Sequence, residues 1–198
     1  MCDFANAISN SESELTRGWK CTVPYTPDIQ ICSWEYVTCS RGFVSSLSLS
    51  ALHLIGTIPT SVGNLKYIKQ LSLNENSFHG ILPDSLSAST NMISLMLSHN
   101  SIIGTIPSTY GSLRKLTQFK LKGNLFSGTL SAELAKMSSL QYMELSDNKL
   151  VGAIPKNLGQ LSSTLRILYL ANNKLSGAVP VELCKLTSLI APIDVSGN

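Results

Sequence analysis

The feature that most constrains this chain is a segment that recurs every 24 residues from Val44 onward. The same apolar position recurs at each step, and the only longer step, of 25 residues, falls at Thr164. The residues at this first position are Val44, Ile68, Met92, Leu116, Leu140, Leu165 and Leu189. Because the pattern keeps its phase along most of the chain, it predicts similar units stacked side by side.

Within each unit the fourth and sixth positions are apolar and alternate with residues of other kinds. This period of two predicts a short strand that buries these side chains and turns the intervening ones outward. The buried pairs are Leu47 and Leu49, Leu71 and Leu73, Leu95 and Leu97, Phe119 and Leu121, Met143 and Leu145, Leu168 and Leu170, and Ile193 and Val195. Such residues can pack only against neighbouring units, so stability must come from stacking.

The ninth position holds an asparagine where the chain leaves the predicted strand. An asparagine amide both donates and accepts hydrogen bonds, so a stack of them can satisfy the buried backbone at this bend. The predicted structural asparagine ladder consists of Asn76, Asn100, Asn124, Asn148, Asn173 and Asn198. Leu52 replaces the ladder asparagine in the first unit.

Glycine and proline recur at fixed positions after the ladder and predict that the chain turns there. The glycines are Gly56, Gly80, Gly104, Gly128, Gly152 and Gly177, and the prolines are Pro59, Pro83, Pro107, Pro155 and Pro180. Ser131 stands in place of the proline in the fourth unit. The pattern keeps its phase through this substitution.

The LxGxIP segment resembles the plant-type leucine-rich repeats of receptor-kinase ectodomains and polygalacturonase-inhibiting proteins. The resemblance covers residues 43–198, as six complete repeats and a truncated seventh. It implies an α/β, β-rich leucine-rich-repeat solenoid. We expect a right-handed superhelix with a parallel β-sheet on the concave face, and with loops or 3-10 turns on the convex face.

Residues 1–42 lie outside the repeat phase and are expected to form an N-terminal cap. The segment CSWEYVTC at 32–39 resembles the CxWxGVxC element that caps plant-type repeats, with Tyr36 in place of the glycine. The same segment is also similar to leucine-rich surface antigens of kinetoplastid parasites. The class of organism therefore stays open.

The cap contains four cysteines, Cys2, Cys21, Cys32 and Cys39, and this even number in a segment with little core favours structural disulfides. Three pairings are possible. Local reach and the family resemblance favour Cys32–Cys39, with Cys2–Cys21 as its complement. Cys184 is left over, and we expect it to be a buried free thiol. A zinc site is a weaker alternative, because the spacing lacks paired CxxC motifs.

The disulfides favour an extracellular or cell-surface location, although no asparagine begins an Asn-x-Ser/Thr glycosylation site. The first thirty residues lack the pattern of a signal peptide. No run approaches the ~20 apolar residues that span a bilayer, so we expect no membrane contact within this chain. We interpret the chain as a fragment of a longer protein, with any membrane anchor outside it.

The sequence offers no catalytic constellation, and we expect the chain not to be an enzyme. His53, His79 and His99 occupy different repeat positions and do not converge. Ser45, Ser46, Ser48 and Ser50 are interpreted as surface serines because no GxSxG elbow is present. Without a GxGxxG or P-loop motif, nucleotide binding is not supported, and we expect no cofactor, metal or nucleic acid.

The outward residues of the strands form columns that run across the predicted concave face. One column reads Ser48, Ser72, Met96, Lys120, Glu144, Tyr169 and Asp194, and its neighbour reads Ser46, Gln70, Ser94, Gln118, Tyr142 and Ile167. Tyrosine and arginine often anchor protein interfaces, and they gather in the fourth to sixth repeats. The candidate ligand-binding residues are Met96, Lys120, Lys122, Tyr142, Glu144, Arg166 and Tyr169. The alternative is a solvated sheet face whose aromatic rings pack over neighbouring strands.

The function we expect is recognition of a protein or peptide, as part of an extracellular receptor-like or cell-surface protein. A secreted enzyme inhibitor is one alternative, and a structural or adhesive surface-coat protein is another. The net charge of +3 is uneven, because residues 114–198 carry 10 basic and 5 acidic side chains. These cations form a solvated basic face or attract an anionic partner. The oligomeric state is left open.

Overall fold

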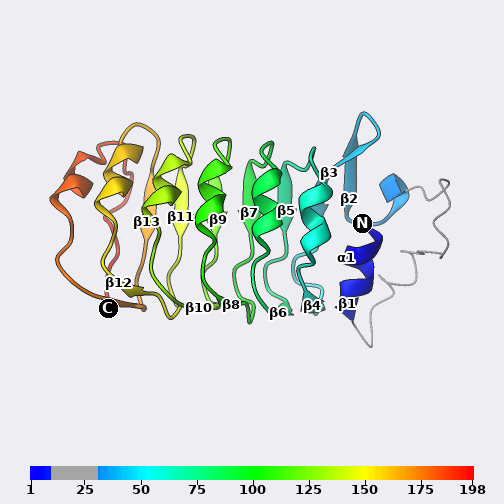
Figure 1. The fold of residues 1–198 in the computed structure, drawn as a ribbon, viewed down its shortest axis with the longest axis horizontal. Coiled ribbons are helices and arrows are strands. Elements are labelled where there is room, and N and C mark those ends of the chain that lie inside the picture. The colour runs from blue at the N-terminus through cyan, green and yellow to red at the C-terminus, as the bar shows by residue number, and fades with distance from the viewer. Residues whose placement is uncertain (10–30) are drawn as a thin grey trace.

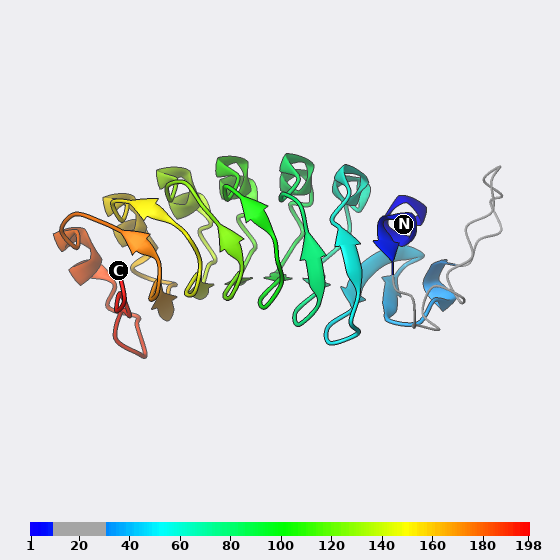
Figure 2. The same cartoon turned by 90° about the horizontal axis from the view of Figure 1, so that it is seen from below.

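The repeats stack in a single curved row. The structure is a computed structural model, and it describes residues 1–9 and 31–198. Figure 2 shows the repeats along an arc, with the strands on its inner side and the 3-10 turns on its outer side. The predicted leucine-rich-repeat solenoid with a parallel sheet on its concave face is therefore confirmed.

The main sheet has seven strands, in the order β13-β11-β9-β7-β5-β3-β2. Neighbouring strands from β3 to β13 are parallel, whereas β2 pairs with β3 in an antiparallel hairpin. The strands are β2 (Val37–Ser40), β3 (Phe43–Ser48), β5 (Gln70–Ser72), β7 (Ser94–Met96), β9 (Gln118–Lys120), β11 (Tyr142–Glu144) and β13 (Ile167–Tyr169). Figure 1 shows them side by side along the molecule.

Shorter strands follow the ladder asparagines and form three small sheets. They are β4 (Ile55–Thr57), β6 (Ser77–His79), β8 (Ile103–Gly104), β10 (Leu125–Phe126), β12 (Val151–Gly152) and β14 (Lys174–Leu175). These strands pair in parallel, as β4 with β6, β8 with β10 and β12 with β14. Each pair therefore adds a second line of backbone hydrogen bonds between adjacent repeats.

The outer side of the arc is made of 3-10 turns. They are η2 (Thr60–Asn64), η3 (Asp84–Ala88), η4 (Ser108–Ser112), η5 (Ala132–Lys136), η6 (Lys156–Leu161) and η7 (Val181–Lys185). A proline precedes five of them, because its fixed φ suits the residue before a helical turn. Ser131 precedes η5 instead, and its hydroxyl accepts a hydrogen bond from the Glu133 amide at 3.2 Å.

The core is a column of apolar side chains enclosed by the strands and turns. Leu71, Leu95, Phe119 and Met143, which occupy the same position in successive repeats, are fully buried. Backbone N–H groups of each repeat reach carbonyls of its neighbour, so burial leaves few backbone groups without a partner. Stacking therefore supplies both the apolar contacts and the hydrogen bonds.

The asparagine ladder joins each repeat to the one before it. Asn124 Nδ2 donates to the Leu97 carbonyl of the preceding repeat at 2.9 Å and to the Leu121 carbonyl at 3.1 Å. Its Oδ1 accepts from the Ile102 amide at 3.1 Å. The other five ladder asparagines make the same three kinds of hydrogen bond.

The first repeat lacks a ladder asparagine, and Asn76 of the next repeat supplies an acceptor there. Its Oδ1 accepts hydrogen bonds from the Leu52 amide at 3.1 Å and from the Leu54 amide at 2.9 Å. Leu52 itself packs against the apolar core. The substitution therefore leaves these two backbone donors hydrogen-bonded.

The N-terminal end of the row is covered by elements outside the repeat phase. They are α1 (Cys2–Ala7), β1 (Ile8–Ser9) and η1 (Ile31–Ser33). Strand β1 pairs antiparallel with β4, a contact that the sequence pattern did not predict. A disulfide joins Cys32 to Cys39. The predicted Cys2–Cys21 pairing lies outside the described residues, because Cys21 falls in the segment 10–30.

Several sequence-based expectations were wrong. Ile193 and Val195, predicted to be buried, are only half-buried, whereas Ser72 and Ser94, predicted to face outward, are buried. Cys184 is a free cysteine but is exposed, whereas its neighbour Leu183 is the buried residue of η7. Ser45, interpreted as a surface serine, is a buried residue of β3, and its hydroxyl donates to the Thr38 carbonyl of β2 at 3.1 Å.

Candidate functional site

The outward columns predicted from the repeat lie in register across the concave sheet. Tyr142 pairs with Gln118 on one side and with Ile167 on the other. In the neighbouring column Glu144 pairs with Lys120 and Tyr169. We call Lys120, Tyr142, Glu144 and Tyr169 the concave patch, because these four residues are neighbours on three adjacent strands.

A cation–aromatic contact lies at the centre of the concave patch. Lys120 Nζ is 5.9 Å from the centroid of the Tyr142 ring, within the range in which a ring attracts a cation. Both side chains are half-buried, as expected for residues that lie along a sheet face. The contact holds the Tyr142 ring beside Lys120 while leaving part of it accessible.

Tyr169 lies between two acidic residues. Glu144 is its partner on β11, and Asp194 is bridged to it from the next coil of the chain. The Asp194 carboxylate accepts hydrogen bonds from the hydroxyl of Ser196 at 2.7 Å and from its amide at 3.0 Å. These bonds lower the pKa of Asp194 below its ordinary value, because they stabilise its charged form.

A second polar cluster lies just beyond the ends of the strands. Lys122 Nζ is 3.7 Å from Asp147 Oδ2, and Asp147 Oδ1 accepts a hydrogen bond from Asn172 Nδ2 at 2.7 Å. The repeat pattern predicted Lys122 as a site residue but not its two partners. The period of two ends with the strand, so it gives no direction for a residue such as Asp147, whose φ is +57°.

The other two predicted site residues lie at the margins. Met96 pairs with Lys120 in register and is half-buried. Arg166 is exposed and precedes β13, where its amide donates to the Gln141 carbonyl at 2.8 Å. Arg166 therefore lies at the edge where the strands begin, and it is not brought into the concave patch beside Tyr169.

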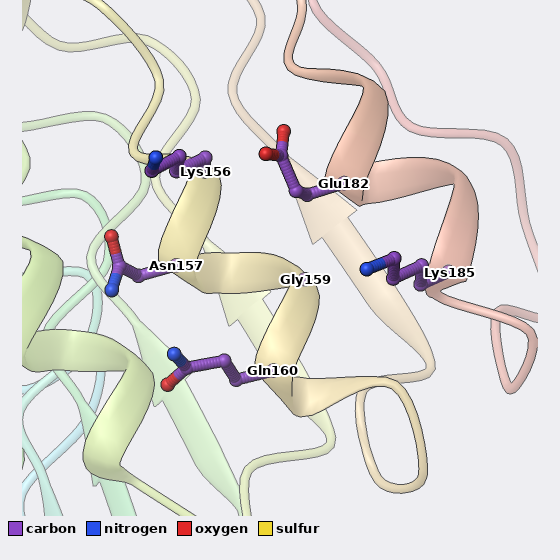
Figure 3. Close-up of a pocket in the computed structure, with 6 residues that line it drawn as sticks. All are labelled: Lys156, Asn157, Gly159, Gln160, Glu182 and Lys185. Atoms are coloured by element: carbon purple, nitrogen blue, oxygen red, sulfur yellow. The ribbon is translucent and has the colours of Figure 1, made fainter.

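Two shallow hollows lie on the outer side of the arc. One of about 310 Å³ lies between η6 and η7, where Glu182 and Lys185 extend toward η6 above Gly159 (Figure 3). An equivalent hollow of about 330 Å³ lies between η4 and η5 beside Gly111. Because the hollow recurs where a glycine faces the next turn, it is a feature of the repeat rather than a distinct site.

The described residues hold no group of three or more histidine, cysteine, aspartate or glutamate side chains placed to bind a metal ion. His53, His79 and His99 are all exposed. Within the same residues, no helix has both the length and the apolar character needed to cross a membrane.

The parallel sheet, the 3-10 turns and the asparagine ladder together define a leucine-rich-repeat solenoid. The family model described as Leucine Rich Repeat matches residues 67–89, 91–113, 139–161 and 164–186. Curated proteins similar to this chain include plant receptor-like kinases and receptor-like proteins. One of them, the LRR receptor-like serine/threonine-protein kinase EFR of Arabidopsis thaliana, is 33% identical over 89 residues, or 43% of this chain.

Solved plant receptor structures share the fold. The crystal structure of PEPR1-AtPEP1 has a TM-score of 0.89 and 29% identity over 97% of this chain. The Arabidopsis receptor kinase HAESA, solved with the peptide hormone IDA and the co-receptor SERK1, has a TM-score of 0.85 and 31% identity over 99% of this chain. This chain covers 8% of the EFR kinase, 27% of the PEPR1 chain and 32% of the HAESA chain.

Proposed function

We propose that this chain is a recognition module of an extracellular receptor-like or cell-surface protein, and that its concave patch binds a protein or peptide. The observation that carries the proposal is the register of Lys120, Tyr142, Glu144 and Tyr169 on three adjacent strands. Rigid strands hold these side chains in place, so little conformational entropy is lost when a ligand orders them.

The similar solved structures support this proposal. HAESA was solved in complex with a peptide hormone and a co-receptor, and this chain shares the leucine-rich-repeat fold of that receptor. Extended peptides suit a curved sheet face because their side chains meet successive columns of outward residues. The role we propose is recognition and not catalysis.

We propose different roles for the two parts of the chain. Residues 1–42 act as an N-terminal cap, supported by β2, which extends the main sheet, and by β1, which extends a small sheet. Residues 43–198 form the repeats that present the concave patch. Lys122, Met96 and Arg166 would contribute at the margins of a bound ligand, because they surround the patch without joining it.

The test begins with selection of ligands from a displayed library of random peptides, using the intact chain as bait. Selected peptides are then titrated against Tyr142→Ala and Tyr169→Ala, with Tyr67→Ala as a control for an exposed tyrosine elsewhere. We expect each concave variant to weaken binding by about 5- to 150-fold, the range of a hot-spot tyrosine. Melting temperatures should stay close to that of the parent.

The proposal fails if the selected peptides bind both concave variants as tightly as the parent. Peptides weakened only by Tyr67→Ala would report a different surface. A large fall in melting temperature for either concave variant would assign that tyrosine a structural role.

A further inference from the structure

Two aromatic side chains are exposed beside each other near the start of the solenoid. Phe43 and Tyr67 are 51% and 53% exposed, and their ring centroids are 4.3 Å apart with an interplanar angle of 32°. They occupy the same position in successive repeats, just before Val44 and Ile68. Apolar side chains that are exposed next to each other can mark an interaction site, whereas single exposed apolar residues are common.

Another exposed apolar side chain lies in the third repeat. Ile93 is 43% exposed, and its amide donates to the Lys69 carbonyl at 2.7 Å, which places the two residues side by side. Asn91 follows Tyr67 in its column, and its Nδ2 donates to the Lys66 carbonyl at 3.1 Å. Ile93 therefore flanks the Phe43–Tyr67 pair, with Lys69 beside it.

Cations surround these apolar side chains. Arg41 and Lys69 line the same hollow as Phe43 and Tyr67, and the exposed residues Lys66 and Lys115 both hydrogen-bond Asn91 beside it. Neither of the two ion pairs found in the described residues involves them. Lys115 Nζ donates instead to Asn91 Oδ1 at 2.8 Å. Among the described residues, no carboxylate lies within ion-pair distance of these cations, so they give the edge a positive field.

The nearest acidic residues in the sequence point elsewhere. Glu75 follows β5 at the opposite end of the strands, and Asp84 begins η3, where the Thr109 hydroxyl donates to it at 3.1 Å. Glu35 precedes β2 at the end away from the hairpin turn. The positive field is thus a property of this edge and not of the whole N-terminal half.

The β2–β3 hairpin gives this edge a concave shape. Its turn residues, Arg41 and Gly42, have φ values of +53° and +80°, as in a tight two-residue hairpin turn. The hairpin rises at the N-terminal end of the row beside the loops that lead into the strands (Figure 1). A hollow of about 590 Å³ lies there, lined by Ser40, Arg41, Phe43, Tyr67, Lys69 and Asn91.

We propose that this edge surface, formed by Arg41, Phe43, Tyr67, Lys69, Asn91 and Ile93, binds an acidic segment of a partner protein. An apolar side chain of that segment would enter the hollow against Phe43 and Tyr67, and flanking carboxylates would face Arg41 and Lys69. An apolar centre with a charged rim is the usual arrangement of a protein interface. Exposed Ile93 favours a protein over an acidic polysaccharide, because aliphatic area adds nothing to the binding of sugar hydroxyls.

The test uses the intact chain and four labelled probes. The first is a ten-residue peptide of glutamate and aspartate with one central phenylalanine. The second replaces that phenylalanine with serine, the third replaces all acids with their amides, and the fourth is a polygalacturonate oligosaccharide. Fluorescence anisotropy at low and at physiological salt measures each affinity. We expect the first probe to bind at least about tenfold more tightly than each of the others.

Variants locate the binding. We expect Tyr67→Ala and Lys69→Glu each to weaken binding of the first probe by about tenfold. Lys69→Glu should also reduce the dependence of that binding on salt concentration. Lys185→Glu makes the same change in net charge as Lys69→Glu, but on distant η7. Tyr169→Ala removes a tyrosine from the concave patch. Both control variants should bind the first probe as tightly as the parent does. Because Lys69 is exposed, its variant remains informative if Tyr67→Ala alters the hairpin.

Four results would overturn the proposal. Equal affinities for the phenylalanine and serine peptides would show that charge alone determines binding. If Lys185→Glu weakened binding of the first probe as much as Lys69→Glu does, the effect of charge would not be specific to the edge surface. Tighter binding of polygalacturonate than of the first peptide would make the edge a polysaccharide site. Absence of binding by every probe would leave the edge surface without an acidic ligand.

Discussion

A single ladder asparagine illustrates how much one side chain contributes in this fold. Asn124 is 5% exposed and makes three hydrogen bonds of 3.1 Å or less to backbone groups, two of them in the preceding repeat. Replacement by alanine leaves the Ile102 amide and two carbonyls without this partner in a buried setting. The loss therefore combines missing hydrogen bonds with the cost of keeping polar groups away from water.

We expect Asn124→Ala to lower the free energy of unfolding by about 1–3 kcal/mol, as measured by urea denaturation. Asn157→Ala is the matched control, because Asn157 lies on the surface of η6 away from the ladder. The control should change stability by less than about 0.5 kcal/mol. Similar losses in the two variants would contradict the structural role of the ladder.

Tyr110 occupies a repeat position that is leucine or valine in most other repeats, and it is fully buried. Its hydroxyl donates to the Pro83 carbonyl at 3.0 Å, and its ring meets Phe119 edge to face with centroids 6.5 Å apart. Burial raises the pKa of Tyr110 above its ordinary value, and the negative charge of Asp84 raises it further. The folded chain therefore strongly favours the protonated phenol.

This raised pKa predicts a loss of stability in alkali. The unfolded chain releases the Tyr110 proton above pH ~10, whereas the folded chain retains it. The contribution of Tyr110 to the free energy of unfolding is therefore complete below that pH and falls as the pH rises further. We expect Tyr110→Phe to be less stable than the parent by about 0.5–1.5 kcal/mol at pH 8. By pH 11 this difference should shrink. Urea denaturation across that range measures it, and a constant difference would contradict the assignment.

At the scale of the elements, the fourth residue of each 3-10 turn alternates along the chain. It is Gly63, Gly111 and Gly159 in η2, η4 and η6, but Ser87, Ala135 and Cys184 in η3, η5 and η7. A Cβ at any of the three glycines would meet a backbone carbonyl of the following turn. The turns therefore approach closely in pairs, which the average repeat does not reveal.

We expect Gly111→Ala to destabilise the chain by about 1–3 kcal/mol, because the new methyl group would meet the Glu133 carbonyl oxygen of η5 and the backbone must shift. Ser108→Ala is the control, since Ser108 is an exposed residue of the same turn. Thermal or urea unfolding of both variants measures the effect. Unchanged stability of Gly111→Ala would mean that η4 and η5 can separate at little cost.

At the scale of the whole molecule, the sequence predicted well whatever the repeat itself determines. Parallel strands stack in phase, so a constant step of 24 residues places Tyr142 beside Gln118, and Glu144 beside Lys120, as the structure shows. The ladder follows from the same step, because each asparagine meets the equivalent backbone of its neighbour. Register and core were therefore predictable from one aligned pattern.

The features that were not predicted are those that the repeat pattern does not determine. The pairing of β1 with β4 joins two segments that are far apart in sequence and of different kinds. Asp147 follows the strand in a left-handed conformation, so alternation does not set its direction. The edge surface combines residues before the strands with the tip of a hairpin, and no single repeat contains both. Cys184 is exposed because no described turn stacks on η7, whereas the equivalent Ala135 is covered.

The alternating glycines make a pair of repeats the natural building block of this solenoid. Removing two adjacent repeats would leave every close approach on the outer side intact, whereas removing one would bring two turns of the same kind together. Removal of the fourth repeat, for example, would set the Gly111 turn against the Gly159 turn. Shortened or lengthened versions of this molecule are therefore easier to build by removing or adding repeats in pairs, although the strands of the concave sheet pair in the same way throughout.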